Sequence, residues 1–186
     1  MQTSAIEYCG ASLAIAYLLL VTQRRWWAWP AYIASSLLYI PVFWENSLYL
    51  EALLQLFFVI MGAYSWQVWR KLGEVVEPIE WPSRHHWRIL TGWGVLTLLC
   101  GTMMALTPAG PFAYADAFVT IGSVIATYVT FKRVVENWCY WIAINLVAVT
   151  TYSIKGMWVT VALYSLYLLL SVRGLMAWRA ALRKAE

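Results

Sequence analysis

The 186-residue chain is strongly hydrophobic: 62% of its residues are apolar or aromatic, 12% are charged, and the mean hydropathy is +0.64. A soluble domain carries about 25% charged residues, so this composition excludes an ordinary soluble enzyme or binding domain. The net charge of +4 follows from the membrane topology described below and indicates no nucleic-acid partner.

Runs of about 20 mostly apolar residues recur along the chain, and this is the length that crosses a bilayer as a helix. They predict an all-α integral membrane protein with seven transmembrane helices, roughly at Ile6–Thr22, Trp26–Trp44, Ser47–Trp69, Trp87–Leu106, Phe112–Phe131, Asn137–Ile154 and Met157–Trp178. The first run lacks the basic start and the cleavage site of a signal peptide, so we expect a retained helix. The polar stretch at 70–88 is expected to be a surface loop, with His85 and His86 in solvent.

Twelve of the thirteen basic residues fall on one side of this arrangement. They lie in the first, third and fifth interhelix loops and toward the C-terminus: Arg24, Arg25, Arg70, Lys71, Arg84, Arg88, Lys132, Arg133, Arg173, Arg179, Arg183 and Lys184. Lys155 falls on the other side. Since basic loops remain in the cytoplasm, the split predicts an inner-membrane protein with its N-terminus outside and its C-terminus in the cytoplasm.

The first three helices resemble the last three. Glu7 corresponds to Asp116, and "YSWQVWR" at 64–70 corresponds to "RGLMAWR" at 173–179. The expected parts of the single transmembrane domain are a first repeat at about 5–70, a linking helix at about 87–106 and a second repeat at about 112–179. An intervening helix makes the two repeats parallel, and such a 3+1+3 arrangement is typical of transporters with a substrate site near the bilayer midplane.

A basic pair precedes a tryptophan-rich segment in both repeats, "QRRWWAW" at 23–29 and "VENWCYW" at 135–141. Aligning these segments pairs Trp26 with Trp138, Trp29 with Trp141 and Ile33 with Asn145. The second repeat alone then carries an amide at this position. An asymmetric polar site on a symmetric scaffold suits an asymmetric ligand.

Four residues share one face of the sixth predicted helix: Trp138, Trp141, Asn145 and Tyr152. Indole faces attract flat rings and cations, and a buried amide can orient a polar ligand. This face is therefore the main candidate for a substrate-binding stripe. The alternative is that the tryptophans lie at the membrane interface and Asn145 pairs with a neighbouring helix.

The third helix offers further candidates, Glu51, Gln55 and Trp66, and the seventh offers Tyr164. Gln55 is either a second polar contact to substrate or a hydrogen-bonding partner of another helix. Glu51 either attracts cations to the outer mouth or only marks the outer rim. Tyr164 lines the cavity or belongs to the core.

The sequence contains none of the patterns that an intramembrane enzyme or an ATP-driven pump needs. Paired intramembrane aspartates, a Ser/His pair, HExxH and nucleotide-binding motifs are missing. Cys9, Cys100 and Cys139 have no metal-ligand spacing and are expected to be small core residues. We therefore expect no enzymatic activity, no cofactor and no metal.

Several segments resemble one known family. They are "WAWPAYIASSLLY" (27–39), "LYLEALLQLFF" (48–58), "YSWQVW" (64–69), "WCYWIAIN" (138–145) and "YSIKGMW" (152–158). The chain resembles the Pnu family of bacterial vitamin transporters, whose fold is related to that of the SWEET sugar transporters. The resemblance implies a ligand surrounded by Trp138, Trp141, Asn145 and Gln55. It also implies a homotrimer, facilitated diffusion across the lipid bilayer, and trapping of the imported vitamin by a cytoplasmic kinase.

Nicotinamide riboside is the first expected substrate and thiamine the second, because both offer a positively charged aromatic ring to tryptophan faces. Riboflavin, which is neutral, comes third. The sequence departs from the family at Tyr49-Leu50-Glu51, where members often have YAD, and at Ser65, where they often have glycine. A function of another class, a membrane receptor or assembly partner whose aromatic residues only pack, also remains open.

Overall fold

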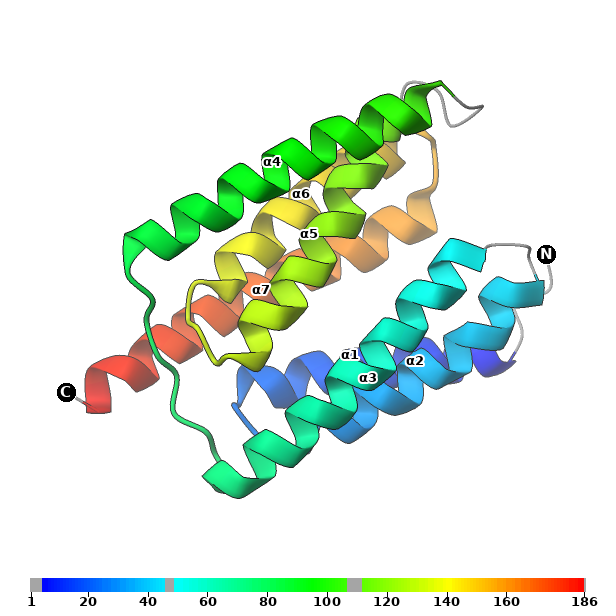
Figure 1. Ribbon diagram of the computed structural model, residues 1–186. Helices are drawn as coiled ribbons and strands as arrows, with labels where there is room; N and C mark the ends of the chain where they lie inside the picture. Colours follow the sequence, from blue (N-terminus) through cyan, green and yellow to red (C-terminus); the bar gives the residue numbers. More distant parts are fainter. Residues whose placement is uncertain (1–4, 46–48, 107–111, 186) are drawn as a thin grey trace. The chain divides into compact units, whose positions relative to one another are not determined.

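The computed structural model describes residues 5–45, 49–106 and 112–185, and these residues form seven helices. The helices are α1 (Ala5–Thr22), α2 (Ala28–Glu45), α3 (Tyr49–Leu72), α4 (Ser83–Ala105), α5 (Ala113–Phe131), α6 (Asn137–Ile154) and α7 (Trp158–Ala185) (Figure 1). Helices are expected for so apolar a chain, because only they satisfy the backbone within one segment in lipid. The prediction of an all-helical chain with seven helices is confirmed.

Four of the described helical segments are long and apolar enough to cross a membrane by length and hydropathy: Ala52–Leu72, Ser83–Ala105, Ala113–Phe131 and Thr160–Lys184. The segment Tyr8–Thr22 is apolar but shorter. Repeated apolar helices of this length make the chain a multi-pass membrane protein.

One boundary differs from its prediction in a way that matters for function. Helix α4 begins at Ser83, directly after Pro82, and the His85 amide donates to the Pro82 carbonyl at 2.9 Å. The polar stretch is therefore only partly a loop. His85 and His86, expected in solvent, lie in the first turns of α4 and are partly buried.

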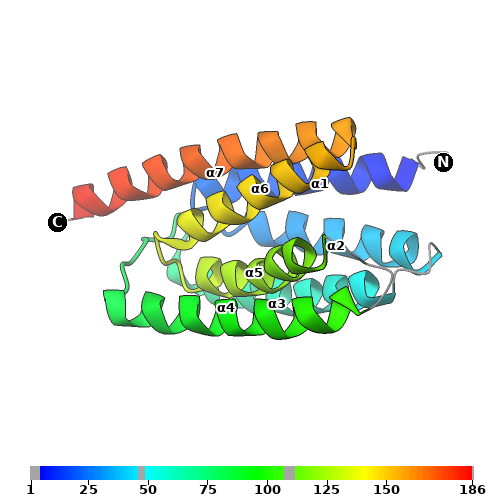
Figure 2. The same ribbon diagram turned by 90° about the horizontal axis from the view of Figure 1, so that it is seen from above.

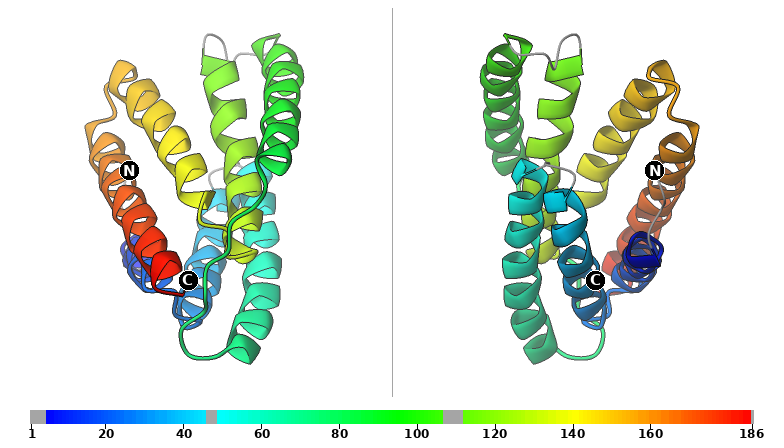
Figure 3. Two further views of the ribbon diagram at one scale, coloured as in Figure 1. Left: turned by 90° about the vertical axis from the view of Figure 1, so that its left-hand side faces the viewer. Right: turned by 90° about the vertical axis from the view of Figure 1, so that its right-hand side faces the viewer.

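The chain divides into two compact units, residues 1–77 and 78–186. In the first unit α2 packs against both α1 and α3. In the second unit the helices pack in chain order, α4 on α5, α5 on α6 and α6 on α7 (Figure 2). Helices α5 and α6 meet at the turn that joins them and diverge toward their other ends (Figure 3). The expected linking helix, α4, thus packs on α5 within the second unit.

The turns before α2 and α6 have the same backbone conformation. Arg24 and Arg133 each adopt a positive φ, 61° and 62°, which is uncommon for residues other than glycine. The amide that follows each arginine donates to the carbonyl five residues earlier in the preceding helix, from Arg25 to Leu20 and from Val134 to Val129. The carbonyls of both arginines also accept hydrogen bonds from the segment between α3 and α4, from Val76 and Ile79 respectively.

Each unit also buries one pair of indoles packed edge to face. The Trp29 and Trp69 centroids are 5.2 Å apart at 86°, and those of Trp138 and Trp178 are 5.5 Å apart at 86°. These pairs and the two arginines share one constant interval in the sequence. Trp29 therefore corresponds to Trp138, and the alignment that paired it with Trp141 is wrong by three positions.

At this interval Trp141 corresponds to Tyr32, and Asn145 corresponds to Ser36 rather than Ile33. Three residues are nearly one helical turn, so both alignments preserve the helical face. This is why the sequence pattern alone did not separate them.

The three cysteines are not core residues as expected. Cys9 and Cys139 are exposed and Cys100 is partly exposed. A small side chain costs little on the surface of a helix in lipid, so hydrophobicity did not decide their burial.

Candidate substrate-binding site

Trp138 is a packing residue between α6 and α7. Its side chain is 1% exposed and lies edge to face on Trp178. A Cβ at Gly174 would lie 2.5 Å from the Trp138 ring, so the glycine is what lets the two helices approach. Its Nε1 is buried and has no hydrogen-bond partner among the described residues. Because the side chain is covered by protein, its ring presents no open face to lipid or to a substrate.

Trp141 is partly exposed, and one edge of its indole is anchored to α5. Its Nε1 donates to Thr130 Oγ1 at 3.2 Å. The same hydroxyl lies 3.0 Å from Asn137 Oδ1 and 2.8 Å from the Ala126 carbonyl oxygen. The anchor fixes the orientation of the ring and leaves part of its surface accessible.

Asn145 is buried, at 3% exposed, and pairs with α7. Its Nδ2 donates to Ser171 Oγ at 3.2 Å, and the Ser171 hydroxyl donates to the Tyr167 carbonyl at 2.7 Å. This is the interhelical pairing that the sequence offered as the alternative to substrate binding. The two roles are compatible, because an amide can exchange one partner for another.

Tyrosines continue the same face toward the C-terminal end of α6. The rings of Tyr152 and Tyr164 stack at 5.4 Å and 24°, and Tyr164 meets Tyr167 edge to face at 5.9 Å and 73°. Beyond them Lys155 lies 3.7 Å from Asp116. The second unit thus places Trp141, Asn145 and the tyrosines along one side of α6.

The candidates on α3 belong to the first unit and are described separately. Gln55 is partly exposed. Trp66 is partly exposed too, but its Nε1 is buried without a hydrogen-bond partner among the described residues. Glu51 is helical, and its side chain lies outside the described part of the structure.

The opposite side of α6 carries a shallow depression. Its volume is about 240 Å³, and it is lined by Leu146, Val147, Thr150 and Thr151. The helical period places these residues away from Asn145. The depression therefore does not belong to the candidate stripe.

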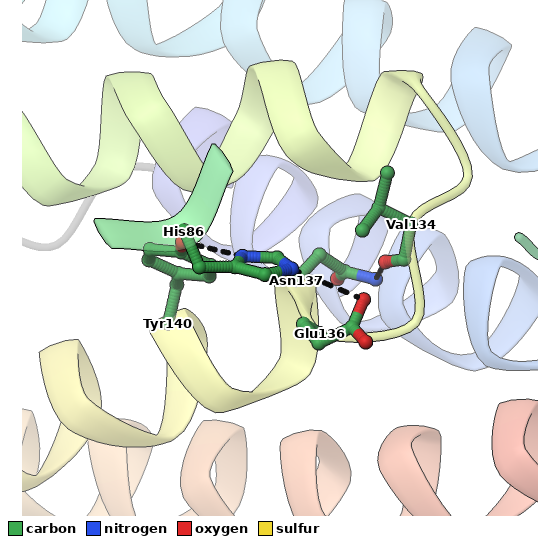
Figure 4. Close-up of polar contacts among 5 residues, drawn as sticks. All are labelled: His86, Val134, Glu136, Asn137 and Tyr140. Carbon is green, nitrogen blue, oxygen red and sulfur yellow. Dashed lines mark hydrogen bonds and ion pairs between the residues drawn. The ribbon is translucent and has the colours of Figure 1, made fainter. Parts of the chain in front are cut away.

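A cluster at the start of α6 was missed because His86 was assigned to solvent. His86 Nδ1 and Tyr140 Oη share a hydrogen bond of 2.9 Å, and His86 Nε2 lies 3.6 Å from Glu136 Oε2 (Figure 4). Beside them Asn137 Nδ2 donates to the Val134 carbonyl at 2.7 Å. The His86 contacts connect α4 to α6, the helix that carries the candidate stripe.

Ser171 and Thr130 were also missed as partners of the stripe. Ser171 shares a helical face with Tyr164 and Tyr167, and this spacing was the available signal. Thr130 precedes the turn before α6 and gives no comparable signal, because hydroxyls at helical spacing are common wherever helices pack closely.

The sequence model of the nicotinamide mononucleotide transporter family matches residues 4–180. This chain belongs to that family. The resemblance to the Pnu transporters is confirmed, and the family is described as one of transporters.

Individual members of the transporter family agree with this assignment. The nicotinamide riboside transporter PnuC of Escherichia coli (strain K12) is 22% identical over 74% of this chain and 69% of its own length. The riboflavin/roseoflavin transporter RibM of Streptomyces davaonensis is 24% identical over 92% of this chain and 83% of its own. A crystal structure of the vitamin B3 transporter PnuC has the same fold, with a TM-score of 0.79 at 22% identity over 99% of this chain and 84% of that one.

Proposed function

We propose that this protein imports a vitamin-like cofactor precursor across the bacterial inner membrane, with nicotinamide riboside as the first candidate. The observation that carries the proposal is the family match over residues 4–180. The relative in Escherichia coli, which is named a nicotinamide riboside transporter, supports this substrate class. Import of this precursor would supply pyridine nucleotide biosynthesis.

Trp141 and Asn145, in the stripe on α6, are proposed to have different roles in substrate binding. Trp141 stacks on the flat ring of the substrate, because its indole is held from one edge and partly accessible. Asn145 breaks its hydrogen bond to Ser171 and forms one with a polar atom of the substrate. Trp138 supports the stripe from its packed position between α6 and α7. Tyr152 and Tyr164 extend the proposed stripe within the second unit. Gln55, Trp66 and Glu51 are proposed separately as substrate contacts of the first unit.

We propose transport by facilitated diffusion, with phosphorylation by a cytoplasmic kinase as the trap. Phosphorylated substrate should not fit the stripe, because none of the residues proposed to line it is basic and could neutralise a phosphate. An imposed sodium or proton gradient should not drive accumulation of unmodified substrate. Such accumulation would contradict the uncoupled mechanism.

A 3+1+3 assembly of two parallel repeats is the proposed architecture, with the N-terminus outside and a homotrimer as the functional unit. The matching turns at Arg24 and Arg133 and the matching indole pairs support the repeats. The split of basic residues supports the orientation.

Riboflavin is the second candidate substrate, because the riboflavin/roseoflavin transporter RibM is similar over 92% of this chain. A neutral flavin would still stack on Trp141 but would gain nothing from a cation–π contact. Thiamine, the other cationic vitamin, belongs in the same comparison.

The test is uptake into liposomes that contain only the purified protein. Labelled nicotinamide riboside, thiamine, riboflavin and their phosphorylated forms are compared, with protein-free liposomes as the control. We expect saturable, gradient-driven uptake of one unphosphorylated vitamin. Binding without net uptake would contradict transport and favour a receptor.

A further inference from the structure

Lys155 is the C-cap residue of α6. It is the one basic residue that the sequence assigns to the outer side of the membrane. Its ammonium is surrounded by groups that attract cations. Nζ lies 4.6 Å from the ring centroid of Phe112, 5.6 Å from that of Tyr152 and 3.7 Å from Asp116 Oδ1. Two ring faces and a carboxylate around one positive charge form a cation site.

The partners of Lys155 come from two helices of the second unit. Phe112 is the N-cap residue of α5, Asp116 lies in its first turn, and Tyr152 lies in the last turn of α6. The N-terminus of α5 stabilises the negative charge of Asp116, and the C-terminus of α6 stabilises the positive charge of Lys155. The site therefore remains suited to a cation whichever cation fills it.

Contacts lead from this site to the candidate stripe. Tyr152 stacks on Tyr164, Tyr164 meets Tyr167, and the Tyr167 carbonyl accepts from Ser171. Ser171 in turn accepts from Asn145. The cation site is thus the accessible end of a continuous row that finishes at the buried amide.

Accessibility differs sharply along this row. The side chains of Lys155 and Asp116 are 27% and 36% exposed, whereas Asn145 is 3% exposed. A lysine ammonium on its flexible stem can move away from its partners. A cation arriving from solvent can therefore meet Asp116 before it meets Asn145.

We propose that Phe112, Asp116 and Tyr152 form an outer subsite for the positively charged ring of a substrate, and that Lys155 fills this subsite until the ring displaces it. The two cations exclude each other, because like charges a few ångströms apart repel. Lys155 then lowers the affinity for loosely held organic cations and leaves neutral ligands unaffected. Only the identification of that cation as a transported vitamin rests on the proposed function.

Binding to purified variants tests the subsite without requiring transport. The probes are the N-methylnicotinamide cation and neutral riboflavin, and the affinity for each is measured by calorimetry. We expect Lys155→Met to bind the cation about fivefold more tightly and Asp116→Asn about fivefold more weakly, the size of one cation–π or charge contact at a half-exposed site. Riboflavin affinity should change less than twofold in both variants, and Lys155→Arg should resemble the wild type.

The first unit offers a matched control. Arg25 and Glu74 form a more exposed ion pair, at 2.6 Å, so Arg25→Met and Glu74→Gln should leave both affinities unchanged. Thermal unfolding of every variant identifies losses that are purely structural. Unchanged cation affinity in Lys155→Met, or equal changes for both probes, would overturn the subsite. Absence of vitamin uptake by the wild type would instead overturn the proposed function.

Discussion

The indole of Trp141 is fixed by Thr130 and partly exposed, which makes it the side chain best placed to stack on a flat ligand. We expect Trp141→Ala to weaken binding of flat vitamins about tenfold or more, because a desolvated cation–ring contact contributes roughly 1–2 kcal/mol. Trp141→Phe should recover part of the loss. Calorimetric affinities of the purified variants measure this, and Trp27→Ala, at an indole 52% exposed, is the control. Unchanged affinity in Trp141→Ala would remove it from the binding stripe.

Asn145 and Ser171 can be separated by comparing two variants. If Asn145 exchanges Ser171 for substrate, Asn145→Leu should weaken the native substrate more than an analogue that lacks the matching polar atom. Ser171→Ala should leave affinity intact and lower stability by about 0.5–1.5 kcal/mol for one lost hydrogen bond. Affinity and unfolding temperature are measured on the same samples. Loss of stability in both variants with unchanged affinity would make Asn145 an interhelical residue only.

At the scale of elements, the close approach of α6 and α7 depends on Gly174. Gly174→Ala would place a methyl group 2.5 Å from the rigid Trp138 ring, so we expect a loss of about 1–3 kcal/mol from overpacking. Thermal unfolding in detergent measures it. Gly94→Ala on α4, where a Cβ would meet no described atom within 4 Å beyond the adjacent backbone of its own helix, should be neutral or slightly stabilising. Equal unfolding temperatures for the two variants would contradict this account.

Helix α4 is fastened to α6 through His86 and Tyr140. Tyr140→Phe removes the hydroxyl that pairs with His86 Nδ1 but keeps the ring beside Trp93. We expect a loss of about 0.5–1.5 kcal/mol, the net contribution of one hydrogen bond, seen as a lower unfolding temperature. Tyr8→Phe, at a side chain 65% exposed, is the control. A matching shift in the control would show that this hydrogen bond contributes nothing specific.

At the scale of the whole molecule, the basic residues predict the orientation. In a chain whose cysteines are replaced, we expect Met157→Cys to react with a membrane-impermeant maleimide in intact cells. Ser83→Cys should react only after the membrane is disrupted, because the third interhelix loop lies on the basic, cytoplasmic side. Both positions are exposed. The opposite labelling pattern would reverse the topology.

The helices were predictable because hydropathy acts locally. The range of α6, Asn137–Ile154, is the one that the apolar run predicts. Helix α4 was placed too late, since its first turns carry His85, His86 and Arg88 and do not look apolar. The similarity between the two halves of the sequence was visible as well. Its register was not, because a shift of three positions keeps every residue near the same helical face.

The sequence by itself determined the class of protein, the number of helices and the face of α6 that carries Trp141 and Asn145. Each of these depends on composition or on the helical period, which neighbouring residues in the chain define. Only the tertiary structure decided which groups lie opposite that face: Ser171 for Asn145, Thr130 for Trp141, Trp178 and Gly174 for Trp138. The helical period gives the direction of a side chain, whereas its partner depends on how separate helices pack.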